Sequence, residues 1–179
     1  EKSIDYRLNI KYNTYMEADA NQSALAAINA ELERIFNRER KKAERIHPAY
    51  VRLWDNLRTI ALAGGKRLRP RLLLQIAGST EPEVVKIAVA HELLHIATLV
   101  HDDIIDNDDV RHGTKNLVGL YKDIYATATG VDTEHYAHSM ALIGGDLLLS
   151  HAHRLIAESG LNAPLVETLQ GLLYRSVFE

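Results

Sequence analysis

The sequence has no cysteine among its 179 residues, and this absence excludes disulfide bonds, thiolate nucleophiles and metal sites built on thiolates. Basic residues are not in excess either, since 21 lysines and arginines face 24 aspartates and glutamates for a net charge of −3. This balance gives no overall positive field for nucleic acid or an anionic membrane surface. Seeing no apolar run of transmembrane length and no signal-peptide pattern, we expect a cytoplasmic protein without a transmembrane segment.

Strand patterns are lacking as well, because no segment alternates apolar and polar residues between hairpin turns. Helical periodicity dominates instead, and the hydrophobic share of 46% is enough for one packed core. We therefore predict a single all-α domain over residues 1–179, with a helical N-terminal segment at 1–46. The helical pattern near the end runs to Phe178 without a glycine stop or polar tail, and the first residue is Glu1 instead of methionine. We expect a chain that is incomplete at the C-terminus.

Capping residues and prolines predict where the helices begin. Asn21 or Ser23 can cap a first helix, and Pro48 can begin a second that stops at Gly64-Gly65. Further helices are expected from Pro70 to Ile76, from Pro82 to Ile105, and over 116–128, 134–158 and 164–178, with a loop at 107–115.

Carboxylates stand at the C-terminal end of the apolar helix that begins at Pro82. Burying an isolated charge beside apolar residues costs free energy. Negative charge at a helix C-terminus costs roughly 0.3–1 kcal/mol per residue, and a bound cation would reverse that sign. Asp102 and Asp106 project about 40° apart on a helix, with Cβ atoms roughly 5–6 Å apart, so both can reach one ion. Oxygen ligands of this kind suit Mg²⁺ completed by water and a phosphate. The alternative is a solvated acidic helix end.

A basic loop precedes this helix, with four cations in the run Gly64-Gly65-Lys66-Arg67-Leu68-Arg69-Pro70-Arg71. Glycines free the backbone, the following helix start offers unpaired N–H groups, and lysine and arginine contact phosphate oxygens. Such a loop alone is more often simply solvated. Together with the acidic cluster it predicts a phosphate substrate held by cations and Mg²⁺.

A competing motif lies within the long helix, where His91-Glu92-Leu93-Leu94-His95 matches the zinc-protease pattern H-E-x-x-H. His91 and His95 could share Zn²⁺, with Glu92 as general base. The extended form needs a glycine where this chain has Thr98. On a continuous helix His101 lies about 15 Å from His91 and cannot join the same ion. We regard a zinc-dependent hydrolase as a less favoured hypothesis than a site for Mg²⁺ and a phosphate substrate.

These motifs, in this order and spacing, resemble those of the trans-isoprenyl (polyprenyl) diphosphate synthases. The D-D-x-x-D alone is less specific, because terpene cyclases carry it too. The resemblance implies a bundle of long helices around a central cavity, usually a homodimer, that elongates an allylic diphosphate with isopentenyl diphosphate. It covers residues 48–179, and the matching segments are Gly64–Pro70, Glu92–Asp106, Arg111–Gly113 and Gly145–Leu148.

The resemblance also implies roles for single residues. The D-D-x-x-D resembles the site of Mg²⁺ on the allylic diphosphate, with ligands Asp102 and Asp106 and support from Asp103. Arg111 resembles a contact to the same diphosphate. The residues that resemble the family's binding site for isopentenyl diphosphate are Lys66, Arg69 and His95, with His112 beside them.

Product length follows from what blocks the growing chain. Ala97 and Thr98 lie five and four residues before Asp102, where bulky aromatics close the cavity early in the resembled family. Ala97 is small, which implies products of C20 or longer, with Leu94 as the next obstacle.

Two departures from the family pattern affect this expectation. His112 stands where the family commonly has arginine, which predicts a weaker and pH-dependent contact. The second aspartate-rich motif of the family is absent from these 179 residues, so we expect the chain alone to be impaired or inactive. The alternative function is a non-catalytic partner subunit that binds diphosphates in a heteromeric synthase.

Overall fold

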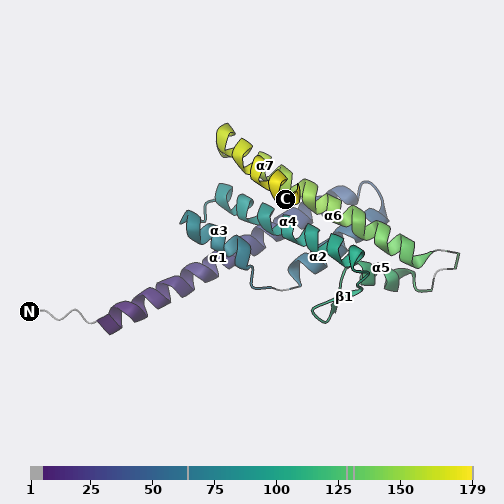
Figure 1. The fold of residues 1–179 in the computed structure, drawn as a ribbon, viewed down its shortest axis with the longest axis horizontal. Helices are drawn as coiled ribbons and strands as arrows, with labels where there is room; N and C mark the ends of the chain where they lie inside the picture. Colours follow the sequence, from purple (N-terminus) through teal and green to yellow (C-terminus); the bar gives the residue numbers. More distant parts are fainter. Residues whose placement is uncertain (1–5, 64, 128, 131, 179) are drawn as a thin grey trace, which may run out of the picture.

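The protein folds into a helical bundle in the computed structural model, which describes residues 6–63, 65–127, 129–130 and 132–178 (Figure 1). Helices hold 79% of the chain, and the all-α prediction is confirmed. The elements in chain order are α1 (Tyr6–Ala43), α2 (Pro48–Leu62), α3 (Leu68–Ala77), α4 (Pro82–Ile105), β1 (Val110–Arg111), β2 (Thr114–Lys115), α5 (Leu117–Tyr125), α6 (Thr133–Ala157) and α7 (Ala163–Phe178).

The centre of the bundle is the pair α4 and α6, which makes the most extensive helix packing in the described chain. Gly145 of α6 allows the close approach, because a Cβ atom there would lie 2.2 Å from Nε2 of His101 on α4. Gly144 gives similar room toward α5 and α2, because its Cβ atom would lie 2.7 Å from a methyl of Leu117 and 3.1 Å from a methyl of Leu57. A side chain at either position would require these neighbours to move.

The prolines predicted two helix starts correctly, at Pro48 and Pro82. The predicted start of the first helix was wrong, because α1 already begins at Tyr6 and runs through Asn21 and Ser23. No glycine or proline interrupts residues 6–43, and serine or asparagine inside a helix costs only a fraction of a kcal/mol, about 0.5. The third helix begins at Leu68, two residues before Pro70.

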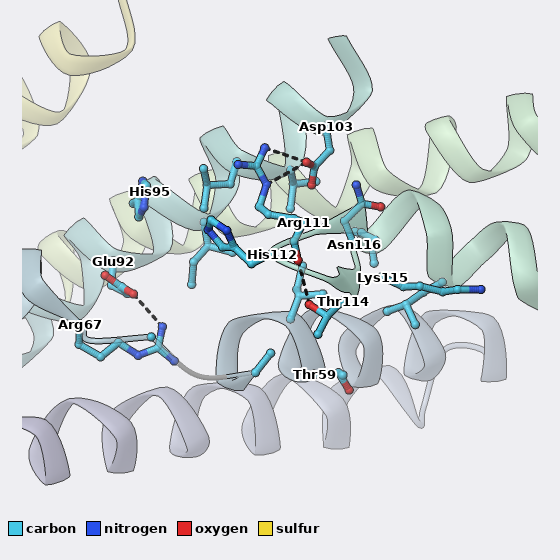
Figure 2. A pocket seen from close by; sticks show the side chains of 18 of the residues that line it. Thr59, Arg67, Glu92, His95, Asp103, Arg111, His112, Thr114, Lys115 and Asn116 are labelled. Carbon is cyan, nitrogen blue, oxygen red and sulfur yellow. Dashed lines mark hydrogen bonds and ion pairs between the residues drawn. The ribbon is translucent and has the colours of Figure 1, made fainter. Parts of the chain in front are cut away.

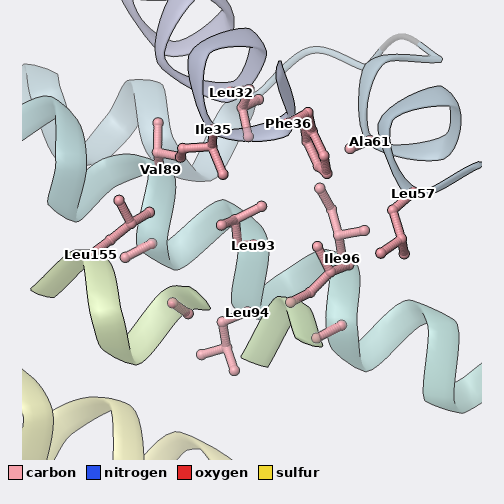
Figure 3. Close-up of a cluster of buried hydrophobic side chains, with 14 of the residues drawn as sticks. Leu32, Ile35, Phe36, Leu57, Ala61, Val89, Leu93, Leu94, Ile96 and Leu155 are labelled. Atoms are coloured by element: carbon pink, nitrogen blue, oxygen red, sulfur yellow. The ribbon is translucent and has the colours of Figure 1, made fainter. Parts of the chain in front are cut away.

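The core joins α1, α2, α4 and α6 (Figure 3). Leu32, Ile35 and Phe36 of α1 are almost fully buried and face the apolar side chains of α4. Trp54 of α2 packs against Phe36, with ring centroids 6.2 Å apart. This packing fixes α2 and α4 relative to each other, and both supply walls of the cavity described below.

Helix α4 is long and apolar enough, by length and composition, to cross a membrane, so the prediction that no apolar run has this length was wrong. Within its apolar window, 61% of the residues are buried inside the bundle. That burial is typical of the central helix of a packed domain.

The predicted loop at 107–115 contains a short hairpin instead, in which Val110 pairs with Lys115 and Arg111 with Thr114. The two turn residues, His112 and Gly113, both have positive φ angles, 51° and 78°. This is the backbone of a type I′ turn, whose twist matches the flanking strands. The turn holds Arg111 and His112 over one side of α4 (Figure 2).

Candidate functional site

A cavity of about 760 Å³ lies between the ends of α2 and α3, the middle of α4, the hairpin and α5 (Figure 2). Apolar side chains of α4 and α5 form part of its wall, among them Ile96, Val100 and Leu117. The polar lining contains every predicted diphosphate contact, although these residues come from three separate segments of the chain. They are Lys66, Arg69, His95, Arg111 and His112.

Arg69 and His95 contact each other across the cavity wall, with Nη1 of Arg69 3.0 Å from Nε2 of His95. A guanidinium can only donate hydrogen bonds, so Nε2 accepts and the imidazole is neutral with its proton on Nδ1. Burial, and then the charge of Arg69, lower the pKa of His95 below its ordinary value. The imidazole is therefore poised to take up a proton when an anion enters beside it.

Arg67 does not offer its charge to the cavity, although it belongs to the basic loop. Its side chain is buried and its Nη1 donates to Oε1 of Glu92 at 2.7 Å, while Nη2 donates to the carbonyl of Ala61. The positive charge that the loop offers to the cavity thus comes from its other members. Arg67 also has a left-handed backbone, with φ 47° and ψ 42°, a conformation that costs a non-glycine residue on the order of 1 kcal/mol.

Arg111 and Asp103 form the second ion pair at the cavity. Nε and Nη2 of Arg111 lie 2.9 and 2.7 Å from Oδ1 of Asp103, whose exposed fraction is 3%. The hydrogen bond that Arg111 donates to the carboxylate of Asp103 raises the pKa of Arg111 above its ordinary value. Asp103 therefore anchors Arg111 at the cavity edge.

Asp102 and Asp106 lie elsewhere, at the exposed C-terminal end of α4, and neither lines the cavity. Their side chains make no hydrogen bond or ion pair with other residues that the structure describes. Two free carboxylates one helical turn apart fit a hydrated Mg²⁺ that takes its other ligands from water and phosphate. No group of three or more histidine, aspartate or glutamate side chains in the described part of the chain could hold an ion by itself.

The side chains of the zinc-protease pattern contact other residues instead of one another. Glu92 is paired with Arg67, and Nε2 of His95 accepts from Arg69. His101 points to α6, where its Nε2 is 3.5 Å from Oδ1 of Asp146. The geometry therefore gives no support to a hydrolase that uses His91 and His95 as ligands and Glu92 as base.

Comparison with known proteins agrees with this geometry. The family model for polyprenyl synthetase matches residues 51–177, a range that contains the whole cavity. The chain belongs to the polyprenyl synthetase family.

Two curated members illustrate the relation. Geranylgeranyl diphosphate synthase of Cyanophora paradoxa is 32% identical over 131 residues, which are 69% of this chain and 37% of that protein. Component 2 of the heptaprenyl diphosphate synthase of Geobacillus stearothermophilus is 34% identical over 150 residues, 82% of this chain and 41% of that protein. The chain thus spans about 37–41% of the length of these polyprenyl synthetase relatives.

Solved structures give the same fold. Geranylgeranyl pyrophosphate synthase of Corynebacterium glutamicum, complexed with isoprenyl diphosphate and magnesium, has a TM-score of 0.68 at 27% identity and covers 76% of this chain and 41% of its own. The geranylgeranyl pyrophosphate synthetase of Pyrococcus horikoshii has a TM-score of 0.65 at 25% identity, with 90% and 43% covered. The bundle is therefore that of a polyprenyl synthetase.

The three predicted product-length positions differ in their surroundings. Ala97 and Leu94 are buried, with exposed fractions of 2% and 7%, and Thr98 is exposed. None of them lines the 760 Å³ cavity. Their influence on product length in this polyprenyl synthetase stays a prediction.

Sequence reasoning missed the pairing of Arg67 with Glu92 and of Arg111 with Asp103. A signal existed for the first pair, because Glu92 stands among apolar residues of a buried helix and a buried carboxylate needs a partner. The sequence could not identify Arg67 as the partner, since Arg67 lies 25 residues before Glu92 and three other cations are close to it in the chain.

Proposed function

We propose that this chain carries the diphosphate-binding part of a trans-prenyltransferase, which condenses isopentenyl diphosphate with an allylic diphosphate to give a trans-polyprenyl diphosphate. The observation that carries the proposal is the convergence of Lys66, Arg69, His95, Arg111 and His112 on one cavity in a chain of the polyprenyl synthetase family. Cationic and imidazole groups around a partly apolar cavity suit a substrate with a diphosphate head and a hydrocarbon tail.

In the proposed reaction, the C–O bond of the allylic diphosphate breaks and diphosphate leaves with the electron pair. The double bond of isopentenyl diphosphate then attacks the allylic carbon, and loss of a proton gives the new trans double bond. Lys66, Arg69 and His95 hold the diphosphate of isopentenyl diphosphate, with His112 beside them. Arg111 contacts the allylic diphosphate, and the apolar wall keeps water from the carbocation.

Mg²⁺ dependence is part of the proposal, with Asp102 and Asp106 as ligands. When bound, the ion neutralises the charge that develops on the departing diphosphate. The free, exposed carboxylates support this assignment, as does the magnesium in the structurally similar synthase of Corynebacterium glutamicum. Asp103 supports the site through Arg111 instead of through the ion.

A homodimer is also proposed, on the resemblance to the family. Large apolar residues on the exposed side of α6 support it, because Leu142 and Ile143 are 52% and 48% exposed. Light scattering across a range of protein concentrations tests it, and a monomer at every concentration would contradict it.

The direct test of the proposed function is diphosphate binding, measured by calorimetry with and without Mg²⁺. We expect isopentenyl diphosphate to bind without the metal and geranyl diphosphate to bind more tightly with it. Turnover is followed in parallel with radiolabelled isopentenyl diphosphate. Failure of both diphosphates to bind under either condition would overturn the proposal.

Product length is proposed as C20 or longer, because Ala97 is small. Ala97→Phe in an active enzyme is expected to shorten the main product toward C15, at an overpacking cost of about 1–3 kcal/mol of unfolding free energy. Chromatography of the prenyl alcohols measures the length. Ala163→Phe, at the exposed start of α7 and outside the cavity, makes the same change in size and should leave the length unchanged. An unchanged length in folded, active Ala97→Phe would contradict the proposal.

A further inference from the structure

We propose that Glu92 and Arg67 are positioning residues, whose buried ion pair fixes the loop before α3 so that Lys66 and Arg69 face the cavity. The pair itself does not bind the ligand. This inference rests on the proposed function, because it takes Lys66, Arg69 and His95 as the groups that bind diphosphate.

Arg67 connects three helices, two through its side chain and one through its backbone. Its Nη1 donates to Glu92 on α4 at 2.7 Å, its Nη2 donates to the carbonyl of Ala61 in the last turn of α2, and its backbone directly precedes α3. Carbonyls in the last turn of a helix lack an intrahelical partner, so the second bond also satisfies α2. A planar guanidinium held at two nitrogens has a fixed orientation, which a single ammonium contact would not give.

The backbone of Arg67 is held in the left-handed region, with φ 47° and ψ 42°. A non-glycine residue keeps this conformation only where contacts with its surroundings hold it there. For Arg67 these contacts are the hydrogen bonds of its side chain to Glu92 and to the carbonyl of Ala61. On the other side of the loop, Nη1 of Arg71 donates to the carbonyl of Lys66 at 3.1 Å, which holds the backbone of the residue that reaches into the cavity.

The buried pair of Arg67 and Glu92 lies next to the pair of Arg69 and His95 at the cavity. Glu92 and His95 lie one turn apart on α4, and they contact Arg67 and Arg69 respectively. Figure 2 shows Arg67 and Glu92 at the same end of the cavity as His95. A shift of Arg67 away from Glu92 would therefore also move Arg69 away from His95.

The Glu92–Arg67 pair cannot strengthen the binding of an anionic ligand through its charge. The carboxylate of Glu92 compensates the guanidinium of Arg67 at 2.7 Å, and both residues are buried, with exposed fractions of 6% and 8%. Together they add no net charge to the cavity. Their effect on an anionic ligand has to come from the position of the loop.

The test is the affinity of the chain for inorganic pyrophosphate, measured by calorimetry in Glu92→Gln and Arg67→Lys. We expect both to weaken binding about tenfold, the lower end of the 10- to 100-fold loss that follows removal of a group supporting a metal ligand. Arg67→Lys keeps the charge and loses the two-point contact, so it separates position from charge. Both variants are checked by circular dichroism and thermal midpoint, and the milder Arg67→Lys serves if Glu92→Gln does not fold.

Glu39→Gln is the matched control. Glu39 is as buried as Glu92, with an exposed fraction of 6%, and it pairs with Lys42 and Arg38 on α1, outside the cavity. We expect Glu39→Gln to lower the thermal midpoint while its pyrophosphate affinity stays within about twofold of the unsubstituted chain. Hydrogen exchange of the amides at 65–69 should rise in Glu92→Gln and not in Glu39→Gln.

Arg69→Gln distinguishes the two ideas. If Arg69→Gln weakens binding and Glu92→Gln and Arg67→Lys bind as tightly as the unsubstituted chain, the positioning role is overturned and the proposed function stands. If Arg69→Gln itself has no effect on pyrophosphate binding, the proposed function fails and takes the inference with it.

Discussion

The middle and the C-terminal end of α4 are built in opposite ways. Around Glu92 and His95, the helix is covered by the loop before α3, and both side chains have arginine partners. At Asp102 and Asp106 the helix end is exposed, and the carboxylates are without hydrogen bonds or ion pairs to the described residues. The comparison teaches that the groups proposed to bind an anion have charged neighbours that hold them in place, whereas the groups proposed to bind a metal ion are exposed and without such partners.

Asp103 marks the border between these two regions. It follows Asp102 in the chain, yet it points inward and is 3% exposed, bound to Arg111. Consecutive positions on a helix point about 100° apart, so neighbouring aspartates reach different surroundings. The motif of three carboxylates therefore divides into two exposed groups, which we propose as cation ligands, and one buried group that is paired with an arginine.

The largest effect is expected from the cationic region. Arg69→Gln should weaken the binding of pyrophosphate in EDTA by about 1.5–3 kcal/mol, roughly 10- to 100-fold, because it removes a charged hydrogen-bond donor from the cavity. Arg58→Gln is a suitable control, since Arg58 pairs with Glu33 outside the cavity. Equal losses in Arg69→Gln and in Asp102→Asn without metal would break the division between the two regions.

Asp103→Asn tests whether Asp103 belongs to the anchored group. We expect a loss of about 1–3 kcal/mol of unfolding free energy, because a buried charged hydrogen bond to Arg111 is removed. Urea unfolding in EDTA measures it. The outcome that contradicts the assignment is an unchanged stability combined with loss of Mg²⁺ binding, which would make Asp103 a ligand.

The fold was largely predictable, because Pro48 and Pro82 begin α2 and α4 and helical periodicity extends along the chain. The start of α1 was not, since Asn21 and Ser23 have the chemistry of caps but lie inside a helix that nothing interrupts. The hairpin at 110–115 was missed for a related reason. Its strands have two residues each, too short for an alternating pattern, and the turn pair His112-Gly113 is not the asparagine-glycine or aspartate-glycine pair that usually indicates a type I′ turn.

The candidate site was predictable in its members and not in its connections. The family resemblance indicated Lys66, Arg69 and His95, and the structure places them at one cavity. Which of four neighbouring cations would be neutralised depends on where Glu92 meets the loop, and that is a property of tertiary packing. The sequence therefore overestimated the charge that the loop offers to a ligand, by counting Arg67.

Removing the exposed carboxylates should stabilise the protein without metal. Asp102→Asn and Asp106→Asn each take a negative charge from the C-terminal end of α4, which should raise the unfolding free energy by about 0.3–1 kcal/mol in EDTA. The same changes should abolish the gain in geranyl diphosphate affinity on adding Mg²⁺. Asp123→Asn, on α5 and paired with Lys115, is the control. Lower stability in EDTA for Asp102→Asn would show that its carboxylate has a structural role.

The remaining effect concerns the pH dependence of pyrophosphate binding. Burial and Arg69 lower the pKa of His95, and a bound diphosphate adds negative charge beside the ring, so binding raises that pKa again. Between the lowered pKa of the free protein and the raised pKa of the complex, binding takes up a proton. Affinity for pyrophosphate therefore rises as pH falls through this window, by at most about tenfold per pH unit, and levels off below the pKa of the free protein.

Calorimetry in buffers of different ionisation enthalpy measures this proton uptake directly. His95→Gln should lose the contribution of the imidazole and keep the part that comes from titration of pyrophosphate itself. His153→Gln is the matched control, because His153 bonds to Gln170 on α7, away from the cavity. Since protonated His95 can no longer accept from Arg69, the same proton also releases the guanidinium toward the ligand. An identical pH slope in His95→Gln and in the unsubstituted chain would mean that the imidazole stays neutral in the complex.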